Sequence, residues 1–244
     1  RTKDFDWNIS LNLAHNENEV TRLSNDVFTM DKILLGDVFI RGGSSSGTHV
    51  LEEGRPIGQF YGLVCNGIDE NGRYILVDKD GDGEISDPAD YDYIGSAQPK
   101  LTYGITNSFR YKNFDLSFFL RGTIGNDILN ATRMAYAQSG FLPGTNALDD
   151  PLTYTLSETP RFSNYYLEKG SFMRLDNLTL GYKIKALNGI RVYFTAQNLF
   201  VITKYKGLDP EVPMDSGDGL TPGVEPREFY PKARTFSVGL NLNF

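Results

Sequence analysis

The sequence ends Phe236-Ser237-Val238-Gly239-Leu240-Asn241-Leu242-Asn243-Phe244, and this stretch decides how the fold is interpreted. Apolar side chains occupy every second position, with small or polar side chains between them, which is the period of a β-strand. The closing strand of a bacterial outer-membrane β-barrel has this pattern because one face meets lipid and the other faces the lumen. The terminal aromatic residue, Phe244, would then mark the end of the barrel. The edge strand of a soluble β-sandwich explains this stretch equally well.

The same alternation recurs along the chain. It is regular in four further segments, residues 5–13, 101–111, 114–121 and 190–200. Two more are less regular, since 172–184 alternates best in its second half and 57–68 is interrupted by glycines. With the closing strand, the pattern predicts about seven antiparallel strands in an all-β fold. A barrel strand needs only about ten such residues, so the mean hydropathy of −0.34 is compatible with a membrane protein.

The connections between these strands alternate in length. Short ones are 111–113 and 185–189, and long, polar ones are 69–99, 122–171 and 201–233. Outer-membrane barrels have short turns on the periplasmic side and long loops outside, whereas a soluble sandwich has no reason for this asymmetry.

The asymmetry also predicts strand directions. With a periplasmic carboxy terminus, the strands expected to run inward are 236–244, 172–184, 101–111 and 5–13. The other three run outward, and residues 14–56 become an unusually long periplasmic connection. Seven strands are an odd number and too few for a bacterial barrel that passes a solute. We therefore expect residues 1–244 to be the carboxy-terminal part of a longer polypeptide, with a plug and further strands upstream.

Composition excludes several classes of protein. Lys and Arg number 24 against 31 Asp and Glu, a net charge of −7 without a basic stripe, so we expect no nucleic-acid partner. The single cysteine, Cys65, rules out an internal disulfide. His15 and His49 have no neighbours at metal or triad spacing, and we expect both to be solvated. Without a nucleophile–base pattern or a definable carboxylate pair, the chain is not expected to be an enzyme.

One segment resembles a calcium-binding loop. It reads Asp78-Lys79-Asp80-Gly81-Asp82-Gly83-Glu84-Ile85-Ser86, with carboxylates at loop positions 1, 3 and 5 and glycine at position 6. Three like charges at this spacing would repel one another without a cation. Position 12 is Ala89, so the loop is complete only if a bulge at Pro88 brings Asp90 in. The predicted Ca²⁺ ligands in loop 78–90 are Asp78, Asp80, Asp82, Glu84 and Asp90, and the alternative is a solvated acidic loop.

A second acidic cluster lacks regular ligand spacing, and we interpret it as a solvated loop. Its members are Asp209, Glu211, Asp215 and Asp218.

Several motifs resemble the SusC/RagA family of TonB-dependent outer-membrane transporters. In order along the chain they are Glu53-Gly54-Arg55-Pro56-Ile57-Gly58-Gln59-Phe60-Tyr61-Gly62, Tyr111-Lys112-Asn113-Phe114-Asp115-Leu116-Ser117-Phe118-Phe119, Phe172-Met173-Arg174-Leu175-Asp176-Asn177-Leu178-Thr179-Leu180-Gly181-Tyr182, Tyr205-Lys206-Gly207-Leu208-Asp209-Pro210-Glu211 and Tyr230-Pro231. Each motif is weak alone, but five in the family's order with matching spacing are specific, and the likeness runs from about residue 5 to residue 244.

The resemblance implies a 22-stranded barrel, which belongs to the size class with a plugged lumen. It further implies import of oligosaccharides or peptides, TonB coupling through the absent amino-terminal portion, and a SusD-like surface lipoprotein over the extracellular face. No substrate-binding residue can be transferred from the family, and the cargo itself is not encoded in any motif.

In a barrel the two strand faces would have different roles. Polar side chains expected to line the lumen are Arg110, Asp115, Arg121 and Arg191. Aromatic residues expected at the lipid interface are Trp7, Tyr111, Phe114 and Tyr182. Four tyrosines, more suited to packing than to stacking on sugars, are Tyr91, Tyr93, Tyr165 and Tyr166. The competing interpretation is a secreted, calcium-stabilised β-sandwich that binds a glycan or a protein.

Overall fold

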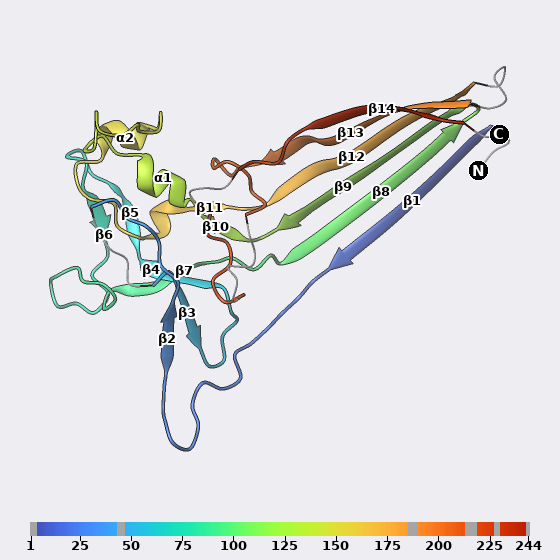
Figure 1. Cartoon of the computed structure of the whole chain (residues 1–244). Helices are drawn as coiled ribbons and strands as arrows, with labels where there is room; N and C mark the ends of the chain where they lie inside the picture. Colours follow the sequence, from blue (N-terminus) through green and yellow to red (C-terminus); the bar gives the residue numbers. More distant parts are fainter. Residues whose placement is uncertain (1–3, 43–46, 185–189, 213–218, 227–229, 243–244) are drawn as a thin grey trace.

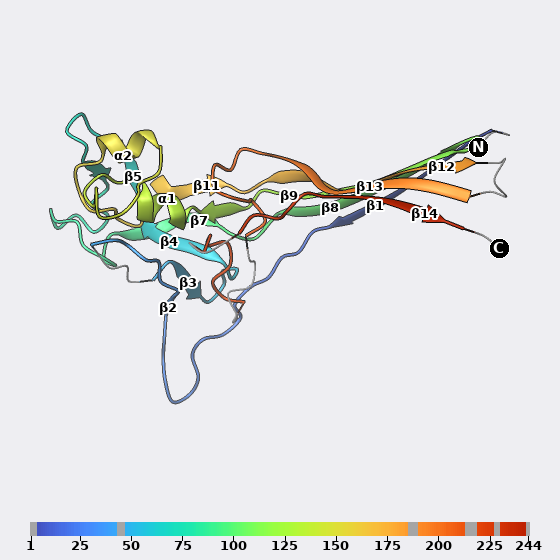
Figure 2. The same cartoon turned by 45° about the horizontal axis from the view of Figure 1, so that its top comes forward.

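The computed structural model describes residues 4–42, 47–184, 190–212, 219–226 and 230–242. The chain has two parts, a long single-layer antiparallel sheet and a smaller lobe at one end of it (Figure 1). Turned toward its edge, the sheet is a thin blade (Figure 2). Strands dominate, and helices are confined to the lobe. In the described part of the chain, no helix is both long enough and apolar enough to span a membrane.

The long sheet contains six strands in the order β1-β8-β9-β12-β13-β14, and every neighbouring pair is antiparallel. Their bounds are Phe5–Ala14, Leu101–Tyr111, Phe114–Ile124, Phe172–Ile184, Ile190–Thr203 and Thr235–Asn241. Six of the seven predicted segments are thus confirmed as strands of one sheet. At about 3.3 Å per residue, an 11-residue strand such as β8 is roughly 36 Å long, enough to cross a bilayer core at a tilt.

The prediction for residues 57–68 as a strand of this sheet was wrong. The segment forms two short strands of the lobe, β4 (Gln59–Leu63) and β5 (Cys65–Ile68), which belong to separate small sheets. Glycine explains the difference. Gly58 has φ of +76°, and Gly62 leaves the space that the Phe162 ring occupies, with atoms 2.6 Å from where a Cβ would lie. These glycines serve turns and close packing inside the lobe rather than a long alternating strand.

Because residues 57–68 are not a strand of the long sheet, the direction predicted for β1 is also wrong. Phe5 pairs with Tyr111 and Ala14 with Thr102, so β1 runs toward the lobe, opposite to the inward direction assigned to residues 5–13. The unusually long periplasmic connection predicted for residues 14–56 disappears with it. Instead, all three long connections leave the sheet at the lobe end, and β1 begins and β14 ends at the opposite end (Figure 1).

The lobe is built from those long connections. Its four-stranded sheet has the order β2-β3-β4-β7, and two-stranded sheets pair β5 with β6 and β10 with β11. The remaining bounds are β2 Lys32–Leu35, β3 His49–Glu52, β6 Tyr74–Leu76, β7 Tyr91–Ser96, β10 Asp127–Leu129, α1 Ala131–Tyr136, α2 Pro151–Thr155, η1 Asn164–Tyr166 and β11 Leu167–Lys169. Asn130 and Asp150 cap α1 and α2 through side-chain oxygens, as their residue types favour.

A conventional hydrophobic core holds the lobe together. Phe60, Met134 and Tyr166 are fully buried in it, and Phe162 is 1% exposed. Cys65 also lies in this core, where burial raises the pKa of its thiol. The long connections are therefore packed structure rather than loose loops, because they bring together side chains from residue 38 to residue 166.

One histidine was assigned wrongly. His49 is fully buried, its Nε2 donates to the Pro222 carbonyl at 2.9 Å, and its Nδ1 lies 2.9 Å from the Thr48 hydroxyl. His15 is exposed, as predicted, and its Nδ1 hydrogen-bonds the Lys100 carbonyl. The His15 pKa is raised, first by that carbonyl and then by Glu17. Sequence spacing could not separate the two, because burial of His49 depends on a segment more than 170 residues away.

The two faces of the long sheet differ sharply. One transverse row of registered residues is apolar across all six strands, Trp7, Phe109, Leu116, Leu180, Phe194 and Val238. Trp7 is 52% and Val238 76% exposed, and among the described residues no second layer covers this face. A β-sandwich would bury such rows against a facing sheet. Trp7 and Phe236 are therefore not packed inside a two-layer body.

Aromatic residues concentrate at the end of this face farthest from the lobe. Phe5, Tyr111, Phe114 and Tyr182 follow one another in register, and Trp7 lies in the next row. The Phe114 and Tyr182 rings are 4.6 Å apart, and Trp7 stacks on Phe109 at 5.7 Å. The aromatic residues predicted for a lipid interface thus share one face and one end of the sheet.

Candidate functional site

The other face of the sheet is polar, and charges of opposite sign alternate across its far end. Asp6 is in register with Arg110, and Arg110 with Asp115. Arg191 donates from Nε to Asp115 at 2.9 Å across the intervening strand β12. Gly181 on β12 makes this possible, because a Cβ there would lie 2.5 Å from the Arg191 guanidinium.

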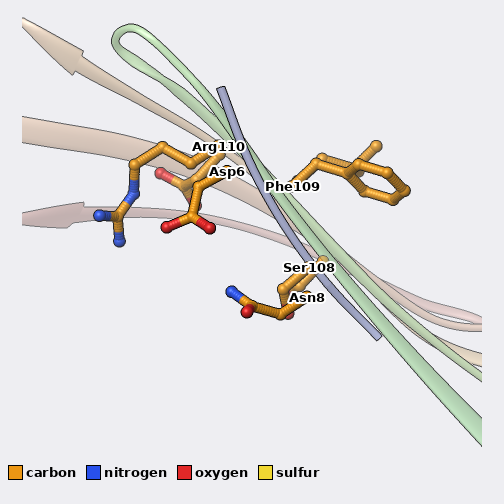
Figure 3. Close-up of a pocket in the computed structure, with 8 residues that line it drawn as sticks. Asp6, Asn8, Ser108, Phe109 and Arg110 are labelled. Carbon is orange, nitrogen blue, oxygen red and sulfur yellow. The ribbon is translucent and has the colours of Figure 1, made fainter. Parts of the chain in front are cut away.

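A shallow polar hollow lies within this charged row. Asp6, Asn8, Ser108 and Arg110 line it from β1 and β8, while Phe109 projects to the opposite side of the sheet (Figure 3). The view shows the period-2 alternation directly, since adjacent residues of one strand face different surroundings. The hollow is open and small, and it shows no arrangement specific to a particular ligand.

A second charged region lies on the same face near the lobe, where two strands are irregular. The register of β12 shifts between Leu175 and Asn177, so Asp176 is an extra residue relative to β9. Opposite it, Asn198 of β13 has a left-handed φ of +51°. Such irregularities re-aim side chains, and both do so here. Asp176 accepts from Arg121 at 3.0 Å, and Asn198 accepts from Arg174.

These side chains bind a segment that crosses the polar face, residues 205–212, which we call the strap. Asp209 of the strap accepts from Arg174, and both side chains are at least 96% buried, with exposures of 1% and 4%. Glu211 receives two hydrogen bonds from Arg121, at 2.7 and 3.0 Å. Lys232 adds a third cation at 2.6 Å from Glu211. Buried charges of this kind need partners, and here each has at least one.

The strap is also fixed at its other end. The Tyr205 hydroxyl donates to Glu225, a fully buried carboxylate, and the Leu208 amide donates to the same side chain at 3.1 Å. The Lys206 amide donates to Glu168 at 2.7 Å. Tyr205 and Val212 pack with Ile128 in a small core of their own. Contacts therefore hold the strap along its whole length.

The solvated-loop prediction for Asp209 and Glu211 was therefore wrong. Burial raises the pKa of Glu211, but hydrogen bonds from Arg121 and Lys232 outweigh it, and the pKa lies below its usual value. Asp215 and Asp218, the other members of the predicted cluster, lie outside the described residues. The sequence contained no spacing signal, because the cationic partners lie 35 and 90 residues from the acids.

The predicted calcium loop lies in the lobe between β6 and β7. Asp78, Asp80 and Asp82 are exposed, and each offers a carboxylate oxygen within 4.8 Å of the others. Amides of Gly81 and Gly83 donate to Asp78 at 2.6 and 2.9 Å, which curls the loop around that carboxylate. Oxygen ligands from three acids suit a hard cation such as Ca²⁺.

The other two predicted ligands have different surroundings. Asp90 is 1% exposed and accepts amide hydrogen bonds from Lys79 and Ser86 at 2.5 and 2.7 Å. These bonds hold the Asp90 pKa below its usual value, with the Ser86 amide as the largest cause. Glu84 is exposed and is not grouped with the three aspartates. Asp90 thus closes the base of the loop, and three of the five predicted ligands converge. Phe244, the predicted terminal signal, lies outside the described residues.

Comparison with known proteins shows which class contains this arrangement. The chain is 36% identical over 262 residues to the TonB-dependent receptor SusC of Bacteroides thetaiotaomicron, covering 100% of this chain and 25% of that protein. It is 32% identical to the TonB-dependent receptor P3 of Formosa agariphila, covering 99% and 27%. The RagAB peptide transporter structure superimposes with a TM-score of 0.74 at 25% identity, covering 98% of this chain and 27% of that one. A scan against protein-family models found no match.

These similarities define the class as TonB-dependent receptors of the bacterial outer membrane. The chain belongs to the SusC/RagA-like TonB-dependent transporters. It spans about a quarter of the length of the relatives it matches. The resemblance inferred from the five motifs is confirmed, and the strap coincides with one of those motifs.

Proposed function

We propose that the chain forms part of the wall and the extracellular head of a 22-stranded outer-membrane barrel that imports nutrients. The observation that carries this proposal is the single-layer sheet with one apolar and one polar face. Apolar rows exposed over a whole sheet face are stable against lipid, and a polar face suits an aqueous lumen. β1 and β14 each pair with only one strand among the described residues, which leaves both edges open to neighbours in a larger barrel.

The proposed partners follow from the arrangement and from the relatives. The lobe stands at the end with the long connections, which in such barrels is the extracellular end. There it would meet a SusD-like surface lipoprotein, while TonB would act through the part of the protein upstream of this chain. The cargo class is an oligosaccharide or a peptide, and the relative RagAB is titled a peptide transporter.

The test uses the full-length protein in its own outer membrane. We expect it to fractionate with that membrane and to require detergent for extraction. In gel electrophoresis an unheated sample should run faster than a heated one, as folded barrels do. Deleting its gene should abolish growth on one class of polymer, either glycan or peptide, and the complemented strain should recover. A protein released as a monodisperse monomer in plain buffer would contradict the proposed barrel.

We further propose that loop 78–90 binds Ca²⁺ as a structural ion, with Asp78, Asp80 and Asp82 as ligands. The support is the close approach of three carboxylates, which would repel one another without a cation. Calorimetry on the intact protein should show calcium binding that Asp82→Ala removes. The matched control is Glu70→Gln, which neutralises another exposed acid of the lobe and should leave calcium binding unchanged. No heat in the unmodified protein would disprove the site.

A further inference from the structure

The strap, residues 205–212, lies on the polar face of the sheet rather than standing out from the surface as a loop. Arg121 and Arg174, which bind it, are in register with each other on β9 and β12. Arg121 also has the parity of Asp115 and Ser117, and so projects from the face opposite to Leu116 and Phe118. The strap and the apolar rows therefore occupy opposite sides of the same wall.

From this placement we infer that the strap is a ledge inside the lumen, clamped to the barrel wall by Arg174 and Arg121, which narrows the passage beneath the lobe. The inference rests on the proposed function, because the polar face encloses a lumen only in a barrel. It makes Arg174 a positioning residue, since that side chain acts on the passage through the strap.

The clamp is the network of ion pairs that holds the strap, and it has too many contacts for the strap to open freely. Three cations and three carboxylates take part, Arg121, Arg174, Lys232, Asp176, Asp209 and Glu211. Because their formal charges cancel, the clamp itself presents no net charge to cargo. Asn198 adds a link to the segment entering β14, donating to the Lys232 carbonyl at 2.6 Å. The strap, three strands and that segment are thus joined in one network, which resists local opening.

The free side of the strap is formed by its exposed side chains. Leu208 is 49% exposed, and Lys206 is also exposed. Between them, Gly207 has no room for a side chain, because a Cβ would lie 2.2 Å from a Glu225 oxygen. An apolar and a cationic side chain would therefore be the strap groups that passing cargo meets.

The experiment measures thiol accessibility in the full-length protein in intact outer membranes. Leu208→Cys is treated with a small membrane-impermeant maleimide and, separately, with a large polyethylene-glycol maleimide. A ledge in the lumen reacts with the small reagent and excludes the large one. The control is Val27→Cys, at a position that is 94% exposed, which should react with both reagents. Reaction of Leu208→Cys with both reagents, or with neither, overturns the inference.

The clamp is tested by adding a second substitution to Leu208→Cys. Arg174→Gln should speed labelling on the order of tenfold, because it removes charge-assisted hydrogen bonds from the strap. Glu211 is less buried than Arg174, so Glu211→Gln should have a smaller effect in the same direction. It replaces Arg174→Gln in the test if that variant does not fold. The matched control is Arg191→Gln, which breaks an ion pair on the same face without touching the strap. Equal acceleration by the control overturns the clamp.

Membrane insertion distinguishes failure of the proposed function from failure of the ledge inference. If gel mobility shows that the full-length protein does not form a folded barrel, the proposed function and the ledge fail together. If the barrel forms and Leu208→Cys reacts with the large reagent, the ledge alone fails.

Discussion

The lobe and the long sheet are stabilised in opposite ways. The lobe encloses its own hydrophobic core, in which Phe60, Met134 and Tyr166 are shielded from solvent. The sheet exposes its apolar side chains, and Ile9 and Leu240 are 61% and 62% exposed. One polypeptide therefore carries a part whose apolar contacts are internal and a part whose apolar contacts must come from its surroundings. In water alone the second part lacks the burial that stabilises the first.

The largest expected effect is the loss of lobe stability when its hydrophobic core is disrupted. Phe60→Ala removes a fully buried ring and should destabilise the lobe by about 3–5 kcal/mol, since a cavity remains. Amide hydrogen exchange of the lobe strands in the full-length protein measures the change. Tyr154→Ala, at a 74% exposed position of α2, is the control and should change exchange little. Equal effects of the two substitutions would show that the lobe has no core of its own.

The next prediction tests the sheet face that the proposed barrel places against lipid. Leu178 lies on the apolar face, in register with Phe118 and Ala196, so Leu178→Arg should cost about 2–4 kcal/mol in a bilayer. Its neighbour Thr179 has the other parity, and Thr179→Arg should be tolerated much better. Denaturant titration of the full-length protein folded into lipid vesicles gives the difference. A larger cost for Thr179→Arg than for Leu178→Arg would show that the polar face, and not the apolar face, meets lipid.

A smaller effect is expected within the polar face. Gly181→Ala places a methyl group against the Arg191–Asp115 ion pair and should cost about 1–3 kcal/mol through overpacking. Gly140→Ala is the control, because nothing lies within 4 Å of a Cβ there. The same vesicle titration applies. If the two alanines are equivalent, the ion pair adapts without Gly181.

The smallest expected effect concerns the pH dependence of the lobe. Because the Asp90 pKa is lowered in the folded state, its contribution to stability is present above the unfolded carboxyl pKa and lost as the pH falls through the folded value. The lobe should therefore loosen only below about pH 4. Hydrogen exchange of residues 78–90 across that range measures it, and Asp90→Asn should flatten the profile. A transition near neutral pH would contradict this assignment.

The sequence predicted the sheet much better than the lobe, and the physical reasons are specific. Period-2 alternation is a local property, so the strands from residue 101 to residue 124 and the closing strand could be recognised without knowing their neighbours. Residues 57–68 were assigned to the wrong part, because a short apolar run interrupted by glycines fits a strand of the long sheet as well as a strand of the lobe. That error also reversed the direction of β1.

The charged site was the least predictable part. Asp176 faces Arg121 only because the register of β12 shifts there, and a single inserted residue leaves no mark on composition. The clamp acids, Asp209 and Glu211, appeared solvated because their cationic partners are distant in sequence. Three of the five predicted calcium ligands converge, since the spacing of Asp78, Asp80 and Asp82 is local, whereas the place of Asp90 depends on the fold around it.

The contact between His49 and Pro222 has a consequence for biogenesis. Residues from 219 to 226 complete the lobe, since Gly223 and Glu225 pair with Leu129 through backbone hydrogen bonds while Pro222 holds His49. That piece follows β12 and β13 in the chain. A polypeptide that emerges from its amino-terminal side can therefore complete these lobe contacts only after most of the chain has arrived. Truncation shortly before residue 219 would remove the Pro222 carbonyl that accepts from His49 and the backbone groups of Gly223 and Glu225 that pair with Leu129.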